Sequence, residues 1–584
     1  MPYLKKVMDA FSDPKVRLIV LKWGTQLGKS ETILNCLGWV IDESLGPVLI
    51  VYDSEKTYKR FSTTRIQPMI EACPVLRAKK HPNPDKFKIE EMHFQDCIVY
   101  LASAQNPGAL ASLPIEYLFC DELGKYPKFS GKEGDPVQLA MERQKTFPYT
   151  RKTVLVSSPT TSDGAISRYF ESCEEKLCYF VPCPHCGSYQ VLKFEQVKWE
   201  LPEGVDSSDP VAQKYARETA YYECETCKKP IRDKHKPKML AKGKWLRFDG
   251  SPRAESVESI GFWISSLYSP FITFGQVAAK FLEVKDDPPR LMTFVNGWLA
   301  EEWEDVAVQK KDPVKLLETH RTSLPPLTVP RDTLCLTMGI DTQANGFWYV
   351  VRAWLRDRTS YLVDFGFVPS FEELERVIFE RAYPIEDTNE RMSVWRAAID
   401  TGGTALDGGL SMTEAVYYWL RQNSRGIVFG IKGLSQRSGK RVKRTVLDKM
   451  PSGKPLPGGL TLFLIDTIAF KEAIHYRLSL EPGSPGSFLL HSETPEEYVK
   501  QLLSEEKRID TKTGKEKWVR VYKQNHALDC EVYAMATVDT EWFGGLEVLK
   551  RPQGILGQQK AKTPQRPRRR YNSWLNVGGF KKWL

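Results

Sequence analysis

The segment 22–30, with the sequence KWGTQLGKS, has the residue types and spacing of a phosphate-binding loop. Its glycines let the backbone curl so that successive N–H groups face phosphate oxygens, and the following helix adds positive potential at its start. We expect Lys29 to reach the β- and γ-phosphates and the Ser30 hydroxyl to bind Mg²⁺. The residues predicted to contact the nucleotide are Gly24, Thr25, Gln26, Gly28, Lys29 and Ser30. Because Trp23 stands where the standard motif has its first glycine, an ordinary glycine-containing turn is the alternative.

A second stretch, 115–122 (IEYLFCDE), is an apolar strand that ends in two acids. Asp121 would hold Mg²⁺ through its water shell, and Glu122 would polarise a water for in-line attack on the γ-phosphate. Strands that end in Asp-Glu are common, so this one gains its weight from following the Lys29 loop, with which it completes an ATPase site. The strand expected at 153–157 leads into hydroxyl residues as far as Thr160, which either sense the γ-phosphate or simply form a turn.

Four cysteines have the spacing of a metal centre. Cys183 and Cys186 form one C-x-x-C pair and Cys224 and Cys227 form another, with 37 residues between the pairs. Four thiolates give a closed tetrahedral Zn²⁺ site of the zinc-ribbon type, and because no position stays open the zinc would be structural. His185, inside the first pair, is expected to be a bystander.

Three aspartates in the second half of the chain stand where a cation-dependent nuclease needs them. Asp341 and Asp400 each end an apolar strand, and Asp529 lies in the first turns of a helix near the end of the chain. Carboxylates are ligands that Mg²⁺ and Mn²⁺ prefer, and two such ions would activate a water and stabilise the leaving oxygen in phosphodiester cleavage. Each aspartate alone is also an ordinary strand end or helix start, so only their order along the chain singles them out. Asp466 and His526 are second candidates.

The elements around these residues predict two α/β domains. In the first, buried strands alternate with helices, which favours a mostly parallel, helix-covered sheet, that of a P-loop ATPase of the ASCE type. Its expected strands are 16–22, 47–52, 97–101, 115–120 and 153–157, with a helical segment at 55–72. The second domain opens with three strands that we expect to be antiparallel, 334–341, 346–354 and 359–364, as an RNase H-like fold requires.

A chain of 584 residues is too long for one core, and shifts in composition set the expected domain boundaries. We predict a P-loop ATPase domain at 1–170, a zinc-ribbon insert at 171–245, the remainder of the ATPase domain at 246–322, a proline-rich linker at 323–330, an RNase H-like nuclease domain at 331–545 and a basic C-terminal tail at 546–584.

The net charge of +10 is concentrated at the end of the chain. Residues 550–584 hold ten Lys and Arg and no acid, so residues 1–549 sum to zero. Such a tail binds nucleic acid or an acidic partner, or is simply a solvated end. The hydrophobic content of 41% and charged content of 27% are typical of a soluble globular protein. We find no apolar run that would cross a membrane and no signal segment, so we expect a cytoplasmic protein with reduced cysteines.

Ten short motifs in order along the chain resemble the large terminase subunit of tailed phages, in its lambda-like branch. They are 24–30 (GTQLGKS), 105–110 (QNPGAL), 118–122 (LFCDE), 183–186 (CPHC), 268–271 (YSPF), 294–297 (FVNG), 339–341 (GID), 400–403 (DTGG), 431–433 (IKG) and 527–530 (ALDC). Because they extend over nearly the whole chain, the set is far more specific than any one of them.

The resemblance implies an ATP-driven translocase of double-stranded DNA joined to an endonuclease that cuts concatemeric viral DNA. The catalytic residues that it implies are Lys29, Glu122, Asp341, Asp400 and Asp529. Ser30 and Asp121 would bind the Mg²⁺ of ATP, and the three nuclease aspartates would bind Mg²⁺ or Mn²⁺. The stretch from Ser157 to Thr160 would couple hydrolysis to movement.

The partners implied by the resemblance are double-stranded DNA, the small terminase subunit, the portal protein of the prohead and further copies of the chain in a pentameric ring, with no membrane. The implied location is the host cytoplasm, with transient docking on the prohead portal and absence from the mature virion. A cellular helicase-nuclease or a transposase-like recombinase, which combine the same two folds, is the main alternative. A non-enzymatic zinc-ribbon scaffold that binds DNA is the other.

Overall fold

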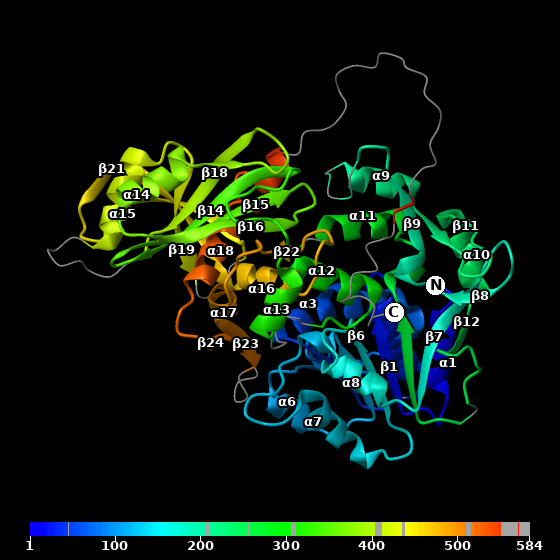
Figure 1. The fold of residues 1–584 in the computed structure, drawn as a ribbon. Helices are drawn as coiled ribbons and strands as arrows, with labels where there is room; N and C mark the ends of the chain where they lie inside the picture. Colours follow the sequence, from blue (N-terminus) through cyan, green and yellow to red (C-terminus); the bar gives the residue numbers. More distant parts are fainter. Residues whose placement is uncertain are drawn as a thin grey trace. The chain divides into compact units, whose positions relative to one another are not determined.

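The computed structural model describes residues 1–44, 46–205, 207, 209, 211–254, 256–285, 287–304, 311–402, 411–434, 439–509, 516–549 and 570–571. The chain divides into two compact units. Unit 1 comprises Met1–Glu200, Lys214–Phe281 and Arg290–Glu304, and unit 2 comprises Leu201–Gln213, Leu282–Pro289 and Asp305–Leu584. Each unit has a sheet with helices on it, which confirms the prediction of two α/β domains (Figure 1).

Unit 1 is built on a mostly parallel sheet. Its strands are β1 (Leu18–Trp23), β2 (Val48–Tyr52), β3 (Glu91–His93), β4 (Ile98–Ser103), β5 (Tyr117–Asp121), β6 (Lys152–Ser157), β7 (Glu175–Pro182), β12 (Lys244–Arg247) and β13 (Ser259–Ile264). They follow the order β12-β7-β13-β1-β6-β5-β2-β4-β3, with β12 and β3 antiparallel to their neighbours. The central strands β2, β5 and β6 are buried along their whole length, as parallel strands covered on both faces must be.

The order of the central strands gives unit 1 the ASCE arrangement that the sequence predicts. β6 lies between β1, which leads into the phosphate loop, and β5, which ends in the acid pair, and it is parallel to both. The carboxyl ends of these strands therefore meet at one edge of the sheet, where ligands of such folds bind.

Helices alternate with the strands along the first half of the chain (Figure 1). The helices are α1 (Leu4–Ser12), α2 (Lys29–Trp39), α3 (Glu55–Phe61), α4 (Gln67–Ala72), α5 (Pro74–Ala78), α6 (Pro107–Ala111), α7 (Pro136–Glu142), α8 (Ala165–Glu171), α9 (Ala212–Thr219), α10 (Lys236–Ala241), α11 (Phe274–Val284) and α12 (Pro288–Phe294). Residues 62–66 continue the helical path between α3 and α4, so the predicted helical segment at 55–72 is confirmed.

The cysteine-bearing segment is inserted between two strands at the edge of the main sheet. Its neighbours β7 and β12 pair within that sheet. Between them lie β8 (Tyr189–Val191), β9 (Val197–Glu200), β10 (Tyr221–Glu223) and β11 (Pro230–Ile231). β8 pairs with β7, and β10 pairs antiparallel with both β9 and β11. Short strands of this kind bury little apolar surface, so a metal is well suited to hold them.

Unit 2 contains the RNase H-like sheet. Its strands are β14 (Thr333–Gln343), β15 (Gly346–Leu355), β16 (Ser360–Val368), β17 (Ala382–Pro384), β18 (Arg391–Asp400), β19 (Val428–Leu434), β20 (Val442–Lys449), β21 (Pro455–Asp466) and β22 (Phe488–Leu489). β14, β15 and β16 are consecutive antiparallel strands, and β18 and β19 follow parallel to β14 on its other side. The resulting order β16-β15-β14-β18-β19 is the one that an RNase H-like fold requires.

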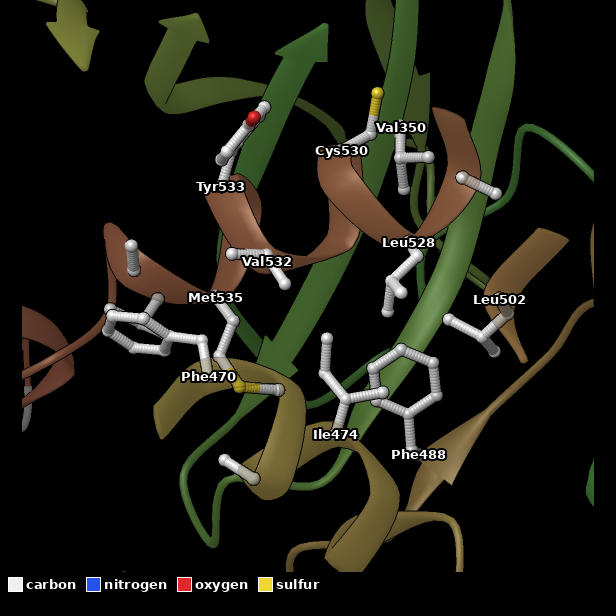
Figure 2. Close-up of a cluster of buried hydrophobic side chains, with 14 of the residues drawn as sticks. Val350, Phe470, Ile474, Phe488, Leu502, Leu528, Cys530, Val532, Tyr533 and Met535 are labelled. Atoms are coloured by element: carbon white, nitrogen blue, oxygen red, sulfur yellow. The ribbon is translucent and has the colours of Figure 1, made fainter. Parts of the chain in front are cut away.

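The helices of unit 2 cover both faces of this sheet. They are α13 (Pro313–His320), α14 (Phe371–Glu375), α15 (Met412–Asn423), α16 (Thr467–Arg477), α17 (Glu496–Leu502) and α18 (His526–Ala536), and a separate hairpin is formed by β23 (Glu505–Ile509) and β24 (Glu516–Arg520). α18 lies across the strands, and its Leu528 points toward Ile474 of α16 and Phe488 of β22 (Figure 2). This buried cluster holds the helix that carries Asp529.

The strands predicted for the first domain correspond to β1, β2, β4, β5 and β6, close to the expected bounds. β13, which lies directly beside β1, is not among the strands predicted from the sequence. The proline-rich stretch 323–330 contacts the sheet of unit 2, because Val329 is fully buried and forms a bridge with Ile385. Most of the predicted basic tail, 550–569 and 572–584, lies outside the described residues.

Among the described residues, no helix combines the length and the apolar character that crossing a bilayer requires.

Candidate active sites and metal centre

The predicted phosphate loop joins β1 to α2 at the carboxyl edge of the sheet. Gly28 precedes the first residue of α2 with φ 86°, and Gln26 has φ 59°. The left-handed region favours glycine, which explains Gly28 at this turn. A Cβ at Gly24 would lie 2.8 Å from the Oγ of Ser266, so a larger residue would collide with that side chain. The loop therefore presents the N-terminus of α2, where backbone N–H groups attract anions.

Lys29 is held by uncharged oxygens. Its Nζ donates to the Ser158 hydroxyl at 2.6 Å and to the Trp23 carbonyl at 3.1 Å. Burial lowers the pKa of Lys29 to about 8, although the carboxylates of Asp121 and Glu122 oppose that shift. Anionic phosphate oxygens would satisfy this ammonium better than a hydroxyl and a carbonyl do.

The acid pair at the end of β5 faces the loop. Ser30 donates its hydroxyl to the Asp121 carboxylate at 3.4 Å. Burial raises the pKa of Asp121 to about 6, and nearby Glu122 adds to the rise while Lys29 opposes it. Glu122 itself has a left-handed backbone with φ 56°, and its carboxylate forms an ion pair with Lys125. A serine hydroxyl beside a buried carboxylate is the donor set expected for the Mg²⁺ of a nucleotide.

Hydroxyl residues after β6 connect the acid pair to the loop. The Ser157 hydroxyl accepts a hydrogen bond from the Gly124 N–H at 3.0 Å, and the Ser158 hydroxyl donates to the Trp23 carbonyl at 2.9 Å. The Thr160 carbonyl accepts from the Trp303 N–H at 2.8 Å. These contacts lie where a γ-phosphate sensor would stand, and that role stays a prediction.

Segments far along the chain support the phosphate loop from behind. Ser266 donates its hydroxyl to the Thr25 carbonyl at 2.9 Å, and Ser269 donates to the Gln26 carbonyl at 2.8 Å. The Thr25 N–H donates to the Gly297 carbonyl at 2.6 Å. The sequence alone does not assign a role to the motifs at 268–271 and 294–297. The fold places them behind the phosphate loop, which they support through these hydrogen bonds.

The four predicted zinc ligands come together in unit 1. The sulfur atoms of Cys183, Cys186, Cys224 and Cys227 all lie within 4.8 Å of one another. The Cys183–Cys227 and Cys186–Cys224 sulfur pairs are each 3.9 Å apart, close to the edge of about 3.8 Å that a tetrahedron with 2.3 Å Zn–S bonds would have. The residues therefore fit a zinc ion with four thiolates.

The turns after the two cysteine pairs have the same backbone form. Gly187 has φ 77° and Lys228 has φ 57°, each directly after the second cysteine of its pair. His185 contacts the Pro230 carbonyl through Nε2 at 3.0 Å and is not part of the cysteine cluster. The expectation that it is a bystander agrees with this geometry.

Strand alternation brings Asp341 and Asp400 to the same face of the sheet in unit 2. On β14, Leu336, Met338 and Ile340 belong to the core on the face of α15, so Asp341 points to the opposite face. On β18, Ile399 likewise joins that core, so Asp400 points with Asp341. Because Ile340 and Ile399 are paired between the parallel strands, the two aspartates follow at the same level of the sheet.

α18 lies on the face to which both aspartates point. A Cβ at Gly339 would lie 1.8 Å from the Cys530 carbonyl oxygen, so only glycine lets the helix approach β14 this closely. The Thr337 hydroxyl donates to the Ala534 carbonyl at 3.2 Å. The first turn of α18, which contains Asp529, is thereby brought over the ends of β14 and β18.

The pKa shifts indicate that the three aspartates lie near enough to affect one another's ionisation. Burial raises the pKa of Asp400 to about 6, and the Asp341 carboxylate adds to the rise. Burial raises the pKa of Asp529 to about 7, and Asp341, Glu505 and Asp400 add to it while Lys471 opposes it. Like charges in one site disfavour ionisation. A divalent cation would remove this repulsion, so the donor set fits the cations predicted for it.

One oxygen of each of two aspartates is already engaged by a neighbour. Asp341 Oδ2 accepts hydrogen bonds from His526 Nδ1 at 2.7 Å and from Gln343 Nε2 at 2.8 Å. Asp529 Oδ2 accepts from Asn525 Nδ2 at 2.7 Å. His526 was a second candidate in the sequence, whereas Gln343 and Asn525 carry no sequence signal of their own.

Asp466, the other second candidate, has a structural role. It is buried at the end of β21, and its carboxylate accepts a hydrogen bond from the Ala469 N–H at 3.0 Å, as the N-cap of α16.

Comparison with known proteins decides the class. Residues 1–245 match the family described as "Phage terminase large subunit gpA, ATPase domain", and residues 259–544 match "Terminase large subunit gpA, endonuclease domain". The chain belongs to the phage terminase large subunit gpA family. This terminase large subunit is 26% identical over 578 residues to "Terminase, large subunit" of Enterobacteria phage P21, which covers 92% of this chain and 85% of that protein. It is also 26% identical over 577 residues, with the same two coverages, to the protein of that name from Escherichia phage lambda.

Two solved structures similar to this terminase are large terminases of other bacteriophages. The crystal structure of the HK97 bacteriophage large terminase has a TM-score of 0.30 at 12% identity, covering 91% of this chain and 95% of that one. The large terminase of a thermophilic bacteriophage, in complex with ADP, has a TM-score of 0.30 at 11% identity, covering 92% of this chain and 98% of that one.

Family membership sets aside the helicase-nuclease, recombinase and scaffold alternatives. This terminase large subunit carries an ATPase domain and an endonuclease domain, the two activities of viral DNA packaging and cleavage. Those activities imply ATP, a divalent metal, and DNA and packaging-machine partners.

Proposed function

We propose that this terminase moves double-stranded DNA into a prohead by ATP hydrolysis in unit 1 and cuts concatemeric viral DNA by a cation-dependent nuclease in unit 2. One observation carries the proposal. The same chain combines a lysine and an acid pair around a phosphate loop with three aspartates that repel one another on a single face of an RNase H-like sheet.

In the ATPase, Gly24, Thr25, Gln26 and Gly28 shape the loop around the phosphates. Lys29 exchanges its bonds to the Ser158 hydroxyl and the Trp23 carbonyl for bonds to the β- and γ-phosphates. Ser30 and Asp121 hold Mg²⁺, which neutralises phosphate charge. Glu122 is freed from Lys125 and accepts the proton of the attacking water. The hydroxyl residues from Ser157 to Thr160 report the γ-phosphate to the rest of unit 1.

In the nuclease, Asp341, Asp400 and Asp529 hold Mg²⁺ or Mn²⁺. Such cations lower the pKa of a bound water and stabilise the leaving oxygen of a phosphodiester. The aspartates are kept fully ionised by the cations, because the repulsion that raises the pKa values of Asp400 and Asp529 is then removed. The Zn²⁺ of the four cysteines is structural, since all four positions are thiolates.

The remaining partners follow from the family resemblance. We propose that the chain binds the small terminase subunit and the portal protein of the prohead, and that it packages as a homo-oligomeric ring of five copies. The basic residues at 550–584 would contact DNA or the portal. The protein would act in the host cytoplasm, dock transiently on the prohead portal and be absent from the mature virion.

Two single substitutions in the full-length protein test the assignment. Lys29→Ala should abolish ATP turnover and leave the cutting of plasmid in Mn²⁺ intact. Asp341→Ala should do the reverse, and each variant is the control for the other. Undiminished turnover in Lys29→Ala would remove the loop from the ATPase, and undiminished cutting in Asp341→Ala would remove the aspartates from the nuclease.

A further inference from the structure

We propose that His526 is a positioning residue of the nuclease, which holds Asp341 by one carboxylate oxygen so that the other oxygen faces the cations. This inference rests on the proposed function of the three aspartates. It concerns a residue that the family match does not assign, and it is drawn from the contacts of the imidazole.

The hydrogen bonds at Asp341 fall on one oxygen. His526 Nδ1 lies 2.7 Å from Asp341 Oδ2, and Gln343 Nε2 lies 2.8 Å from the same atom. A carboxylate only accepts hydrogen bonds, so Nδ1 must carry the proton in this contact. Two donors on Oδ2 fix the plane of the carboxylate and leave Oδ1 as the oxygen available to a cation.

The imidazole is fixed from the other side by Trp348. Asp341 on β14 is paired directly with Trp348 on β15. The rings of His526 and Trp348 are stacked, with centroids 5.3 Å apart and an angle of 5° between their planes. Trp348 in turn packs against Phe367 at 5.3 Å. Trp348 is the cross-strand neighbour of Asp341. An imidazole stacked on the Trp348 indole therefore points the edge of its ring, with Nδ1, at the Asp341 carboxylate.

The residue before His526 makes the same kind of contact with a different aspartate. Asn525 donates from Nδ2 to Asp529 Oδ2 at 2.7 Å. Two consecutive residues at the start of α18 therefore hold two of the three carboxylates, each by a single oxygen. Groups that orient metal ligands in this way contribute about 10- to 100-fold to metal affinity or activity.

The second ring nitrogen suggests a competing role. The His526 side chain is 22% exposed, so Nε2 could instead carry a proton to or from the substrate. A positioning residue needs only a donor at the place of Nδ1, whereas a proton carrier needs the imidazole itself. Amide side chains separate the two roles, because the asparagine amide nitrogen lies near the place of Nδ1 and the glutamine amide nitrogen lies near the place of Nε2.

Three substitutions of His526 in the full-length protein test the proposal by plasmid cutting in Mn²⁺. His526→Phe keeps the stack on Trp348 and removes the donor, so we expect a loss of about 10- to 100-fold. His526→Asn should recover cutting to within about threefold of the wild type, while His526→Gln should resemble His526→Phe. Gln343→Met is the matched variant, because it removes the second donor from the same oxygen. Like His526→Phe, it should raise the Mn²⁺ concentration needed for half-maximal cutting.

Two measurements do not depend on cutting. In the metal-free protein labelled with ¹⁵N-histidine, the His526 signals, identified by their loss in His526→Asn, should show the proton on Nδ1. The electron paramagnetic resonance signal of free Mn²⁺ measures how much Mn²⁺ the protein binds. It should show weaker binding by His526→Phe than by His526→Asn.

Each outcome has a defined meaning. Failure of both amides to restore cutting, with Mn²⁺ binding unchanged, would overturn positioning in favour of proton transfer. Wild-type cutting and Mn²⁺ binding in His526→Phe would overturn it in favour of a packing role. Asp341→Ala is run in parallel, because retained cutting there would refute the aspartate site itself, whereas lost cutting there with an unaffected His526→Phe refutes only this inference.

Discussion

The two proposed active sites differ in the charges that they bury together. In unit 1 an ammonium and two carboxylates share the site, so Lys29 eases the ionisation of Asp121 and the acids ease that of Lys29. In unit 2 the neighbours include like charges, and each of Asp341 and Asp400 makes the ionisation of Asp529 harder. The carboxylates of the first site are paired with Lys29 and Lys125 before its ligand arrives. In the second site Lys471 opposes the repulsion only in part, so cations are needed to remove the rest.

The two sites are also held in shape by different kinds of contact. The ATPase loop is supported by neutral hydrogen bonds from Ser266, Ser269 and Gly297, which do not depend on a ligand. The nuclease carboxylates are held by donors such as His526 and Asn525, which fix the aspartates but cannot cancel their charge.

Removing zinc should have the largest effect, and only on unit 1. The insert reaches the loop through Tyr268, whose hydroxyl accepts from the Leu192 N–H at 2.7 Å and whose neighbour Ser269 supports Gln26. Structural zinc contributes about 10–16 kcal/mol to the folding of small zinc domains. We expect Cys224→Ser to lose the metal, measured as zinc per chain, and to lose ATP turnover.

Cutting of plasmid in Mn²⁺ is the internal control for that variant, because the cysteines lie in unit 1. Loss of cutting together with turnover would mean that the two units do not respond separately. Wild-type ATP turnover by the Cys224→Ser protein would show that unit 1 does not depend on the zinc for its structure.

The affinity of unit 1 for Mg·ATP should fall on both sides of a pH window. Lys29 has a pKa of about 8 in the free protein, so binding should weaken as the pH rises above 8, by about tenfold per pH unit at most. Asp121 has a pKa of about 6, so Mg²⁺ should be held less well as the pH falls below 6. Calorimetric titration with a non-hydrolysable analogue measures both limbs.

Matched variants assign the two limbs. Lys29→Met should remove the fall in affinity at alkaline pH, and Asp121→Asn should remove the fall at acid pH. The pH dependence that remains in each variant should be that of the nucleotide itself. If both limbs persist unchanged in both variants, the window belongs to the nucleotide and the charge balance of the site is not what sets it.

Neutralising one nuclease carboxylate should stabilise the metal-free protein. The folded pKa of Asp529 is raised to about 7 from 3.8, so the folded state binds more protons between those values and the free energy of unfolding falls as the pH rises through that range. Asp529→Asn should therefore raise the free energy of unfolding of unit 2 at pH 8 by about 1–3 kcal/mol and change it little at pH 4.

Chemical denaturation of unit 2 at these two pH values, without divalent metal, makes the measurement. Asp466→Ala is the control, because Asp466 caps α16 and loss of the capping oxygen should destabilise the protein at pH 8. A destabilised Asp529→Asn at pH 8 would contradict the repulsion between the aspartates.

Loss of a supporting hydroxyl should give the smallest effect. Ser266→Ala removes the bond to the Thr25 carbonyl and should cost about 1 kcal/mol, seen as a KM for ATP raised about fivefold. Plasmid cutting should not change. An unaltered KM would mean that the loop keeps its shape without this support.

The two sites also differ in how far the sequence predicts them. The phosphate loop is continuous, so its residues, the flanking strand and the helix are all readable locally. Asp341 and Asp400 could be placed on one face by the two-residue period of strands, because each ends an apolar strand of known parity. The period cannot say that α18 covers that face, which depends on the fit of Gly339 to Cys530.

What the sequence could not predict depends on contacts across long stretches of chain. Ser266 supports Thr25 from 241 positions away, and His526 meets Asp341 from 185 positions away. β13 was not predicted, although it pairs directly with β1 in the sheet. Such contacts follow from the strand order of the whole sheet, which no local pattern contains.

We propose that three aspartates from distant parts of the chain share cations in unit 2, while four cysteines hold zinc in unit 1. Anomalous diffraction from crystals soaked in Mn²⁺ would locate both kinds of metal. We predict Mn²⁺ peaks within bonding distance of Asp341, Asp400 and Asp529, and a zinc peak at Cys183, Cys186, Cys224 and Cys227. A crystal that shows the zinc peak but places Mn²⁺ away from all three aspartates would contradict the account.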